Sequence, residues 1–274
     1  FFKKTHSSKT LYYAGGVALN MVANEKIIRS HLFDNVILNG SVEDNGTAIG
    51  AALAASNQLT KKRSAESITD YYGKKYSNEE ILKAIKNFHF KYEYLEEEKK
   101  YDYVASLIFS NKAVGWFQGG SEFGPRALGN RSILANPINP KMKYILDLYI
   151  KQRDRYRPYA PVVLEECSKE YFDIDGISPV MMSGGKVLRK NLSAITHVDG
   201  SARVQTLAKK DNENFYKLIK SFEKVSGVPI ILNTSFNLPG EPIVESPTDA
   251  LKSFNNGALQ YLCLGNYLVS RITV

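Results

Sequence analysis

The hydrophobic and polar positions of the chain follow two periods. Short apolar runs between Gly, Pro, Asn or Asp predict strands, and these runs lie at residues 10–13, 36–38, 113–117, 159–164, 194–198, 229–232 and 262–269. Segments with apolar residues three or four positions apart predict helices, and these lie at residues 17–32, 47–57, 78–88, 138–149, 214–226 and from Pro247 onward. Because strand-like and helix-like segments alternate, the pattern predicts an α/β (α+β) fold.

The stretch between the two halves of this pattern is polar. Residues 58–67 are polar and charged, and residues 96–100 form a charge run that we expect to be solvated. Ser77, followed three positions later by Glu80, forms a capping box, which predicts the start of one helix inside this stretch. We therefore expect three parts: a first unit at residues 1–57, a connecting segment at 58–100 and a more complete α/β unit at 101–274.

The composition excludes several classes of protein. The chain has 274 residues, of which 43 % are apolar, enough for one large domain or two smaller globular ones. No apolar run approaches the roughly 20 residues of a membrane span, and no secretory leader is visible. Cys167 and Cys263 do not make a disulfide framework, so we expect a cytoplasmic protein with no membrane partner. The net charge of +8 favours anionic partners, among them nucleic acid, acidic lipid and nucleotide phosphates.

The loop at residues 119–132 is the strongest candidate for an anion site. It sets Arg126 and Arg131 among four glycines, a proline and small polar residues. Such a loop buries little apolar surface. Glycine lets backbone N–H groups approach a ligand closely, and a guanidinium can grip phosphate or carboxylate with two parallel hydrogen bonds. The alternative is a Gly/Pro turn with two solvated arginines.

Three further segments after residue 100 carry polar residues that suit anions, at residues 151–159, 197–203 and 233–237. Open α/β sheets bind their ligands at strand ends, so four such segments together favour a phosphate-rich ligand. For Arg153 and Arg155, a solvated helix end is an equal alternative. His197 is more often a core or turn histidine than a general base, and Asp199 with the following glycine often makes only a turn.

Two features of the first unit are candidates for ligand contacts. Gly15 and Gly16 lie between a predicted strand and a predicted helix, where backbone N–H groups attract phosphate; a tight strand-to-helix turn is the alternative. Asp44 follows a predicted strand, and it either ligates a metal or only forms a turn with the next two residues. The sequence contains no P-loop, no His-Glu-x-x-His zinc motif and no Gly-x-Ser-x-Gly elbow.

Taken together, these segments resemble the carbamoyltransferase family of nodulation and antibiotic-tailoring enzymes, the NodU/CmcH type. The matching stretches keep their order and cover nearly the whole chain, at residues 14–20, 44–52, 122–135, 157–161, 196–205, 227–237, 240–244 and 264–267. The resemblance implies a YrdC-like twisted mixed sheet with flanking helices at 101–274, preceded at 1–57 by the C-terminal remnant of an actin/sugar-kinase-like α/β domain. We therefore expect the C-terminal part of an O-carbamoyltransferase, with the N-terminal half of the same enzyme as its partner.

The resemblance also implies a two-step reaction. The YrdC-like lobe would combine carbamoyl phosphate with ATP, together with Mg²⁺, into carbamoyl-adenylate. The kinase-like lobe, with Fe²⁺ or a similar divalent metal, would pass the carbamoyl group to a hydroxyl acceptor, and we expect the chain alone to lack the complete transfer site. The residues expected to bind phosphate or carbamoyl are Arg126, Arg131, Lys151, Arg157 and Arg203. The residues expected to bind nucleotide are Asn233, Ser235 and Asn237, with Gly15, Gly16 and Asn20 at a second site, and the expected metal ligand is Asp44.

Two other functions stay open from the sequence. A basic YrdC-like RNA-binding module would present lysines interleaved with exposed aromatic residues, and the candidate patch is Tyr92, Tyr94, Lys99, Lys100, Tyr101 and Tyr103. A non-catalytic nucleotide sensor is the other alternative. We expect small-molecule substrates rather than a nucleic-acid partner.

Overall fold

A computed structural model describes residues 7–62 and 70–272 of the chain. The strands are β1 (Thr10–Tyr12), β2 (Asn35–Ile37), β3 (Lys91–Tyr94), β4 (Val114–Phe117), β5 (Arg131–Ala135), β6 (Ala160–Leu164), β7 (Phe172–Asp173), β8 (Ser183–Val187), β9 (Ser201–Leu207), β10 (Ile230–Ser235), β11 (Tyr261–Leu264) and β12 (Tyr267–Ser270). The α-helices are α2 (Met21–Arg29), α3 (Asp44–Thr60), α4 (Asn78–Ile85), α5 (Glu97–Phe109), α6 (Met142–Ile145), α7 (Ser168–Tyr171), α8 (Glu213–Ser226) and α9 (Pro247–Asn256). Short helical turns are η1 (Gly16–Leu19), η3 (Glu165–Cys167), η4 (Ser193–Ile195) and the π-helical η2 (Leu146–Ile150).

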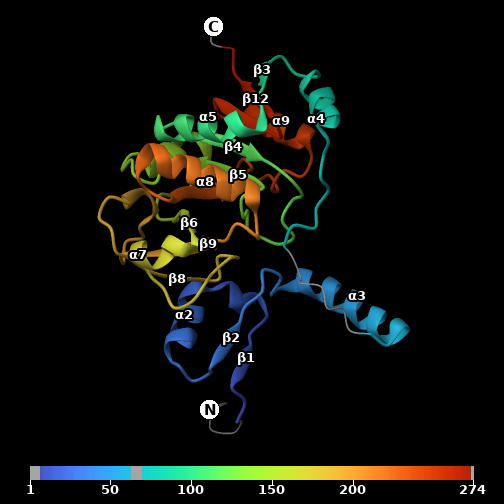
Figure 1. The fold of residues 1–274 in the computed structure, drawn as a ribbon, viewed down its shortest axis with the longest axis vertical. Coiled ribbons are helices and arrows are strands. Elements are labelled where there is room, and N and C mark those ends of the chain that lie inside the picture. The colour runs from blue at the N-terminus through green and yellow to red at the C-terminus, as the bar shows by residue number, and fades with distance from the viewer. Residues whose placement is uncertain (1–6, 63–69, 273–274) are drawn as a thin grey trace.

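A ten-stranded mixed sheet forms the centre of the molecule, in the order β3-β12-β11-β4-β5-β10-β6-β9-β8-β7 (Figure 1). The pairs β4–β11 and β6–β9 are parallel, and the other neighbours are antiparallel. The predicted α/β class, a mixed sheet with flanking helices, is confirmed.

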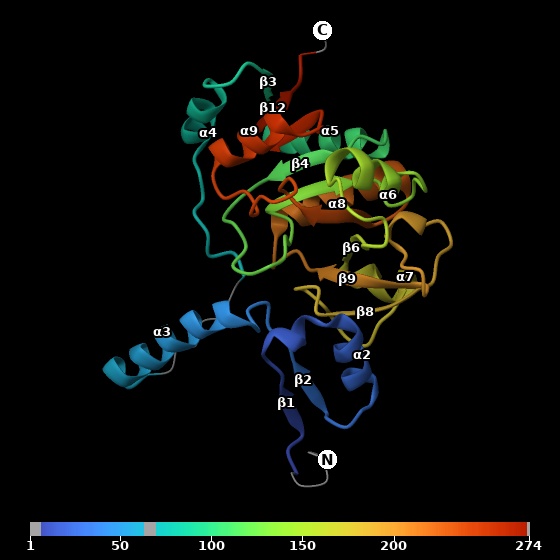
Figure 2. The same ribbon diagram turned by 180° about the vertical axis from the view of Figure 1, so that it is seen from behind.

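Helices cover both faces of this sheet, as the two opposite views show (Figures 1 and 2). On β4, the buried Trp116 packs in one hydrophobic cluster with side chains of α5 and α8. The next residue, Phe117, packs in the other cluster with side chains of α4, α6 and α9. Ile231 and Leu232 of β10 divide between the two clusters in the same way. Successive strand residues point to opposite faces, so this alternation produces a three-layer arrangement with two cores.

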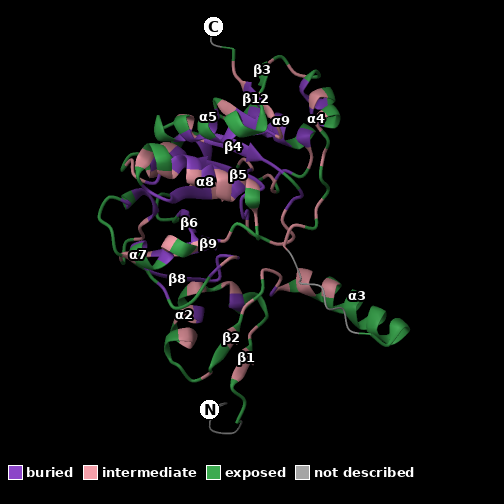
Figure 3. Cartoon of the chain, viewed as in Figure 1, coloured by how far each residue is buried: buried purple, intermediate pink, exposed green. Residues whose placement is uncertain are grey.

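The N-terminal unit is attached to the β8 side of the large sheet. Strands β1 and β2 pair in parallel, and α2 connects them and contacts β8. Asn24 of α2 is buried and donates through Nδ2 to the Met182 carbonyl at 2.7 Å. Helix α3 has no buried residue in the described part of the chain and extends away from the other elements (Figures 1 and 3). The unit therefore presents much apolar surface to solvent, including Val17, Val22 and Leu53.

Several predicted elements need correction. The strand predicted at 194–198 is wrong, because η4 ends at Ile195 and a turn with Gly200 at φ +80° precedes β9. The single strand predicted at 262–269 is a hairpin of β11 and β12. The charge run at 96–100 is not simply solvated, because it opens α5 and Lys100 is buried.

The capping box of Ser77 and Glu80 is confirmed at the start of α4. Within the predicted connecting segment, β3 pairs with β12 and joins the large sheet, which the sequence pattern did not indicate.

Candidate functional site

A partly buried carboxylate and a fully buried guanidinium hold the glycine-rich loop in place. Glu122 accepts hydrogen bonds at Oε1 from the backbone N–H groups of Leu128 (2.7 Å) and Asn130 (2.8 Å), and burial raises the pKa of its carboxyl. The guanidinium of Arg131 is fully buried and lies 3.6 Å from the centre of the Phe117 ring. Its N–H groups donate to backbone carbonyls of Lys74, Gln118, Gly119, Asn130 and Glu245.

These contacts give Arg131 a structural role in place of the ligand contact predicted from the sequence. All five guanidinium N–H groups have backbone acceptors nearby, so none is left over for phosphate. The side chain instead joins the loop to β4, to the segment before α4 and to the segment before α9.

Arg126 and Arg203 form the centre of a positively charged cluster that also includes Arg153. Burial, together with the charges of Arg126 and Arg153, lowers the pKa of Arg203 to about 10. Burial also lowers the pKa of Arg126, and Glu43 partly offsets this effect. The Nε atoms of Arg126 and Arg203 are buried and have no hydrogen-bond partner among the described residues. Unpaired buried donors on like charges are costly, so this arrangement favours binding of an anion.

Lys151, at the end of the turn η2, binds the C-terminal end of β10 and the segment that follows it. The π-helical turn η2 precedes it, and the backbone N–H of Lys151 donates to the Leu146 carbonyl at 2.7 Å, five residues back. Its Nζ donates to the Ser235 carbonyl (3.0 Å) and to the Asn237 carbonyl and Oδ1 (both 2.8 Å). Ser235 Oγ donates to the same Oδ1 at 2.7 Å. The structure therefore brings together three predicted site residues, since Ser235 and Asn237 lie 84 and 86 positions after Lys151 in the sequence.

The ammonium of Lys151 should make anion binding depend on pH. Burial, with a contribution from Arg153, lowers the pKa of Lys151 to about 8, and Glu241 acts in the opposite direction. The positive charge is therefore lost as the pH rises through 8, and we expect ATP affinity to fall by about tenfold between pH 7 and pH 9. Calorimetric titrations across this range would measure the effect. In Lys151→Arg the charge stays, so a fall of the same size in that variant would contradict the assignment.

The sequence alone left open that Arg153 lies at a solvated helix end. In the structure its side chain is held close to Arg203 by contacts within the protein. The buried carboxylate of Asp147 accepts from Tyr159 Oη at 2.7 Å and lies 3.5 Å from Arg153 Nε, and Lys143 approaches its second oxygen at 3.1 Å. Arg153 also stacks over the Tyr159 ring, 4.3 Å from its centre. The sequence carries no period-2 signal for Arg153, because Lys151 is helical and Gln152 has φ +42°, so this segment is not an extended strand.

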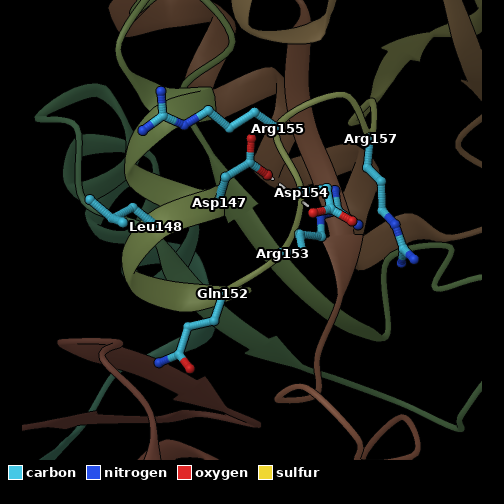
Figure 4. A pocket seen from close by; sticks show the side chains of 7 residues that line it. All are labelled: Asp147, Leu148, Gln152, Arg153, Asp154, Arg155 and Arg157. Carbon is cyan, nitrogen blue, oxygen red and sulfur yellow. Dashed lines mark hydrogen bonds and ion pairs between the residues drawn. The ribbon is translucent and has the colours of Figure 1, made fainter.

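Arg157 lies at the mouth of an open pocket. The pocket is lined by Asp147, Leu148, Gln152, Arg153, Asp154, Arg155 and Arg157. Figure 4 shows Arg155 turned away from Arg157, with Arg157 extended to the side. Lys143 donates to the backbone carbonyls of Arg155 and Arg157 and so holds this loop. Arg157 is exposed, and it can approach a bound anion only from the solvent side.

Asn233 of β10 supports the glycine-rich loop. Its Nδ2 donates to the Ala127 carbonyl at 2.9 Å and approaches Gln205 Oε1 at 3.4 Å, while Gln205 donates to the Leu128 carbonyl at 3.1 Å. The Oδ1 atom of Asn233 is buried and has no hydrogen-bond partner in the described part of the chain. It is therefore an acceptor that can meet an N–H donor of a ligand.

The predicted second nucleotide site is not assembled by the described residues. The N–H of Gly15 donates to the Val42 carbonyl at 2.6 Å, and Gly16 is exposed at the start of η1. The side chain of Asn20 caps α2 by accepting from two backbone N–H groups of its first turn. These three residues lie in the N-terminal unit and have structural explanations, which leaves their predicted contact with an adenylate as a prediction.

Asp44 does not belong to a cluster of metal-ligating side chains in the described part of the chain. It is exposed in the first turn of α3, and residues 7–62 and 70–272 contain no group of three or more His, Cys, Asp or Glu that could hold a metal ion. The residues present do not fit a resident divalent metal, and no step below depends on one. We expect the purified chain to bind Fe²⁺ weakly, because one carboxylate holds a transition metal poorly. Elemental analysis showing tight equimolar metal would contradict this expectation.

The aromatic patch considered for RNA binding is only partly exposed. Tyr92, Tyr94 and Tyr103 are exposed, whereas Lys100 and Tyr101 are buried. Lys99 pairs with Glu96 at 3.0 Å. No helix in the described part of the chain is long and apolar enough to cross a membrane.

The fold and the candidate site define a class of protein: an α/β protein whose mixed sheet carries a partly buried cluster of arginines. Residues 105–271 match the family model described as carbamoyltransferase C-terminus, and residues 2–53 match the one described as carbamoyltransferase N-terminus. The chain belongs to the carbamoyltransferase family, of the NodU/CmcH type.

Three relatives illustrate this membership. The nodulation protein NolO of Bradyrhizobium diazoefficiens is 40 % identical over 279 residues, with 98 % of this chain and 50 % of that protein covered. The 3'-hydroxymethylcephem-O-carbamoyltransferase of Amycolatopsis lactamdurans is 31 % identical, with 93 % and 48 % covered. Nodulation protein U of Rhizobium tropici is 33 % identical, with 85 % and 39 % covered. The chain thus spans about half the length of the curated relatives it matches or less.

Solved structures resemble the chain more distantly. Full-length HypF in its phosphate- and nucleotide-bound form has a TM-score of 0.44 at 18 % identity, covering 67 % of this chain and 23 % of that one. Sua5 of P. abyssi complexed with L-threonine has a TM-score of 0.46 at 17 % identity, covering 62 % and 47 %. The functional argument below rests on the family and on the site of this chain.

Proposed function

We propose that this chain is the carbamoyl-activating part of an O-carbamoyltransferase. Its substrates are carbamoyl phosphate and ATP, with Mg²⁺ accompanying the nucleotide, and its product is carbamoyl-adenylate. The balanced reaction consumes one water and releases phosphate and pyrophosphate, with the new bond between a carbamate oxygen and the α-phosphorus of ATP. The carbamoyl group then passes to an acceptor hydroxyl in the full-length enzyme.

One observation carries this proposal. Arg126 and Arg203 approach each other with Arg153 in a partly buried setting, where their charges depress the pKa of Arg203 and two Nε donors lack partners among the described residues. Proteins rarely keep such a cluster for stability, because desolvated like charges are unfavourable. A ligand with several negative charges removes the penalty, and two phosphate-bearing substrates supply them.

The geometry also suits the chemistry. Forming an acyl-adenylate spreads negative charge over phosphate oxygens in the transition state, and arginines already in place stabilise that charge without reorganisation. Lys151 holds Ser235 and Asn237 together through three hydrogen bonds of 2.8–3.0 Å. In our proposal this arrangement orients the β10 end toward the nucleotide phosphates.

Transfer to a hydroxyl acceptor is assigned to the N-terminal half of the same enzyme as partner. The parallel pair β1–β2 has only two strands, and α3 has no buried residue in the described chain. Parallel strands are typically covered on both faces, so this unit is suited to packing against a further α/β lobe. Asp44, which begins α3, would then meet additional metal ligands.

The half-reactions can be separated experimentally. We expect the chain to catalyse carbamoyl-phosphate-dependent exchange of labelled pyrophosphate into ATP and not to carbamoylate a hydroxyl acceptor. Absence of exchange in a folded sample that binds ATP would overturn the activating role. Carbamoylation of an acceptor by this chain alone would overturn the division of labour. Retention of RNA that falls steeply with salt and ignores ATP would instead favour the RNA-binding module.

A further inference from the structure

A chain of hydrogen bonds determines which nitrogen of the neutral His197 ring carries the proton. Ser201 Oγ lies 2.7 Å from Asp199 Oδ1 and 3.2 Å from His197 Nδ1. The ionised carboxylate can only accept, so Ser201 donates its single proton to Asp199. The Ser201 oxygen then accepts from Nδ1, which must carry the ring proton. The other ring nitrogen, Nε2, is left with a lone pair.

The surroundings keep that lone pair available. Nε2 is buried and has no hydrogen-bond partner among residues 7–62 and 70–272. Burial lowers the pKa of His197, and the positive charges of Arg203 and Lys143 lower it as well, while Asp199 acts in the opposite direction. The ring is therefore neutral at pH 7, and Nε2 is a hydrogen-bond acceptor.

Ser201, which binds the His197 ring, and Arg203 are two residues apart in β9, so their side chains leave the strand on the same face. Among the described residues, Arg203 Nε is one of the two guanidinium donors of the cluster that lack a partner. A ligand held there meets N–H donors from the arginines and a nitrogen acceptor from His197. Carbamoyl phosphate has matching groups, because its phosphate and carbonyl oxygens accept hydrogen bonds and its amino group donates them. An acyl phosphate with a methyl in place of the amino group, such as acetyl phosphate, leaves the acceptor unpaired.

We propose that His197 Nε2 accepts a hydrogen bond from the amino group of carbamoyl phosphate and selects it over acyl phosphates that lack an N–H. This assignment rests on the proposed function, since it presumes that carbamoyl phosphate binds at the arginine cluster. His197 is a specificity-determining residue in this view, and Asp199 and Ser201 position it. A site that hydrogen-bonds a substrate N–H rejects the analogue without it, because the buried partner stays unsatisfied.

Calorimetric titration of inorganic phosphate, carbamoyl phosphate and acetyl phosphate tests the assignment. We expect the wild-type chain to prefer carbamoyl over acetyl phosphate by about tenfold or more. In His197→Phe the preference should fall to near one, with phosphate affinity little changed. His197→Gln, whose amide oxygen can occupy the Nε2 position, should recover part of it. His89→Phe, at an exposed histidine, is the matched control and should behave as wild type.

A pH series on the wild-type chain gives a second test that needs no variant. As the pH falls through the lowered pKa of His197, the ring gains a proton and Nε2 becomes a donor, so the preference for carbamoyl phosphate should shrink while inorganic phosphate still binds. Equal affinity for the two acyl phosphates in the wild type, or an unchanged preference in His197→Phe, would overturn this inference alone. Failure of the folded wild type to bind any of the three ligands would overturn the proposed function instead.

Discussion

Replacing Arg203 by alanine is expected to weaken binding of carbamoyl phosphate or ATP by roughly 10- to 100-fold. A hydrogen bond from a charged donor is worth about 1.5–3 kcal/mol, which corresponds to that range. The positive charge of Arg203 is itself unfavourable in the unliganded protein, because burial and the charges of Arg126 and Arg153 lower its pKa. Removing Arg203 therefore takes a hydrogen-bond donor from the ligand, whereas we expect no comparable loss of stability in the unliganded protein.

The stability of the variant separates this role from a structural one. Arg203 Nε has no hydrogen-bond partner among the described residues, so we expect the midpoint of urea unfolding without ligand to stay the same or rise. Arg189→Ala, which removes an exposed arginine paired with Glu170 at 2.7 Å, is a control for the loss of one positive charge. Calorimetry and unfolding on the same samples would measure both quantities. Unchanged affinity for both ligands would remove Arg203 from the site.

Much of the sheet was predictable from local patterns. The runs at 113–117, 159–164 and 229–232 are strands β4, β6 and β10, and the helix at 214–226 is α8. The strand segments are continuous apolar runs, and the helix segment keeps a strict helical period. The local sequence is therefore enough to predict the secondary structure of each segment. The strand β3 escaped this approach, because all four of its residues are exposed and Tyr, Glu and Lys carry no burial signal.

The roles within the site were harder to predict than its location. The sequence placed Arg126 and Arg131 in one loop but could not distinguish them. The difference arises from partners far along the chain, since Arg131 donates to the Glu245 carbonyl 114 residues away. The sequence named Lys151 and Ser235 as separate candidate ligand contacts and did not indicate that they touch each other, because that contact spans 84 residues. The spacing of hydrophobic residues along the chain carries no information about hydrogen bonds between residues so far apart in sequence.

One glycine of the loop, Gly129, is required by the close approach of the loop to α8. Gly129 has φ +110°, and a Cβ there would collide with the Phe215 ring of α8. The chain can therefore pass close above α8 only with glycine at this position. Glu122 then collects the N–H groups on either side of it, at Leu128 and Asn130. Arg126, which we propose binds ligand, is therefore presented by a loop that other residues hold in place.

Replacing Arg131 by leucine is accordingly expected to destabilise the protein severely. The change leaves several buried carbonyls without a donor and deprives the partly buried Glu122 of a nearby positive charge. Each unsatisfied buried group costs about 1–3 kcal/mol, so we expect a loss of at least about 3 kcal/mol in the free energy of unfolding. Urea unfolding followed by tryptophan fluorescence would measure it, because Trp116 lies in the neighbouring core.

Arg126→Leu, five positions earlier in the same loop, is the matched control for this change. Its Nε has no partner among the described residues, so the same substitution should leave the unfolding midpoint nearly unchanged and weaken phosphate binding instead. The two variants should therefore show opposite effects, with stability lost in one and affinity lost in the other. If Arg131→Leu unfolds at the wild-type urea concentration but no longer binds carbamoyl phosphate, the buried arginine contacts ligand after all. The anchoring role argued from its five backbone acceptors would then be wrong.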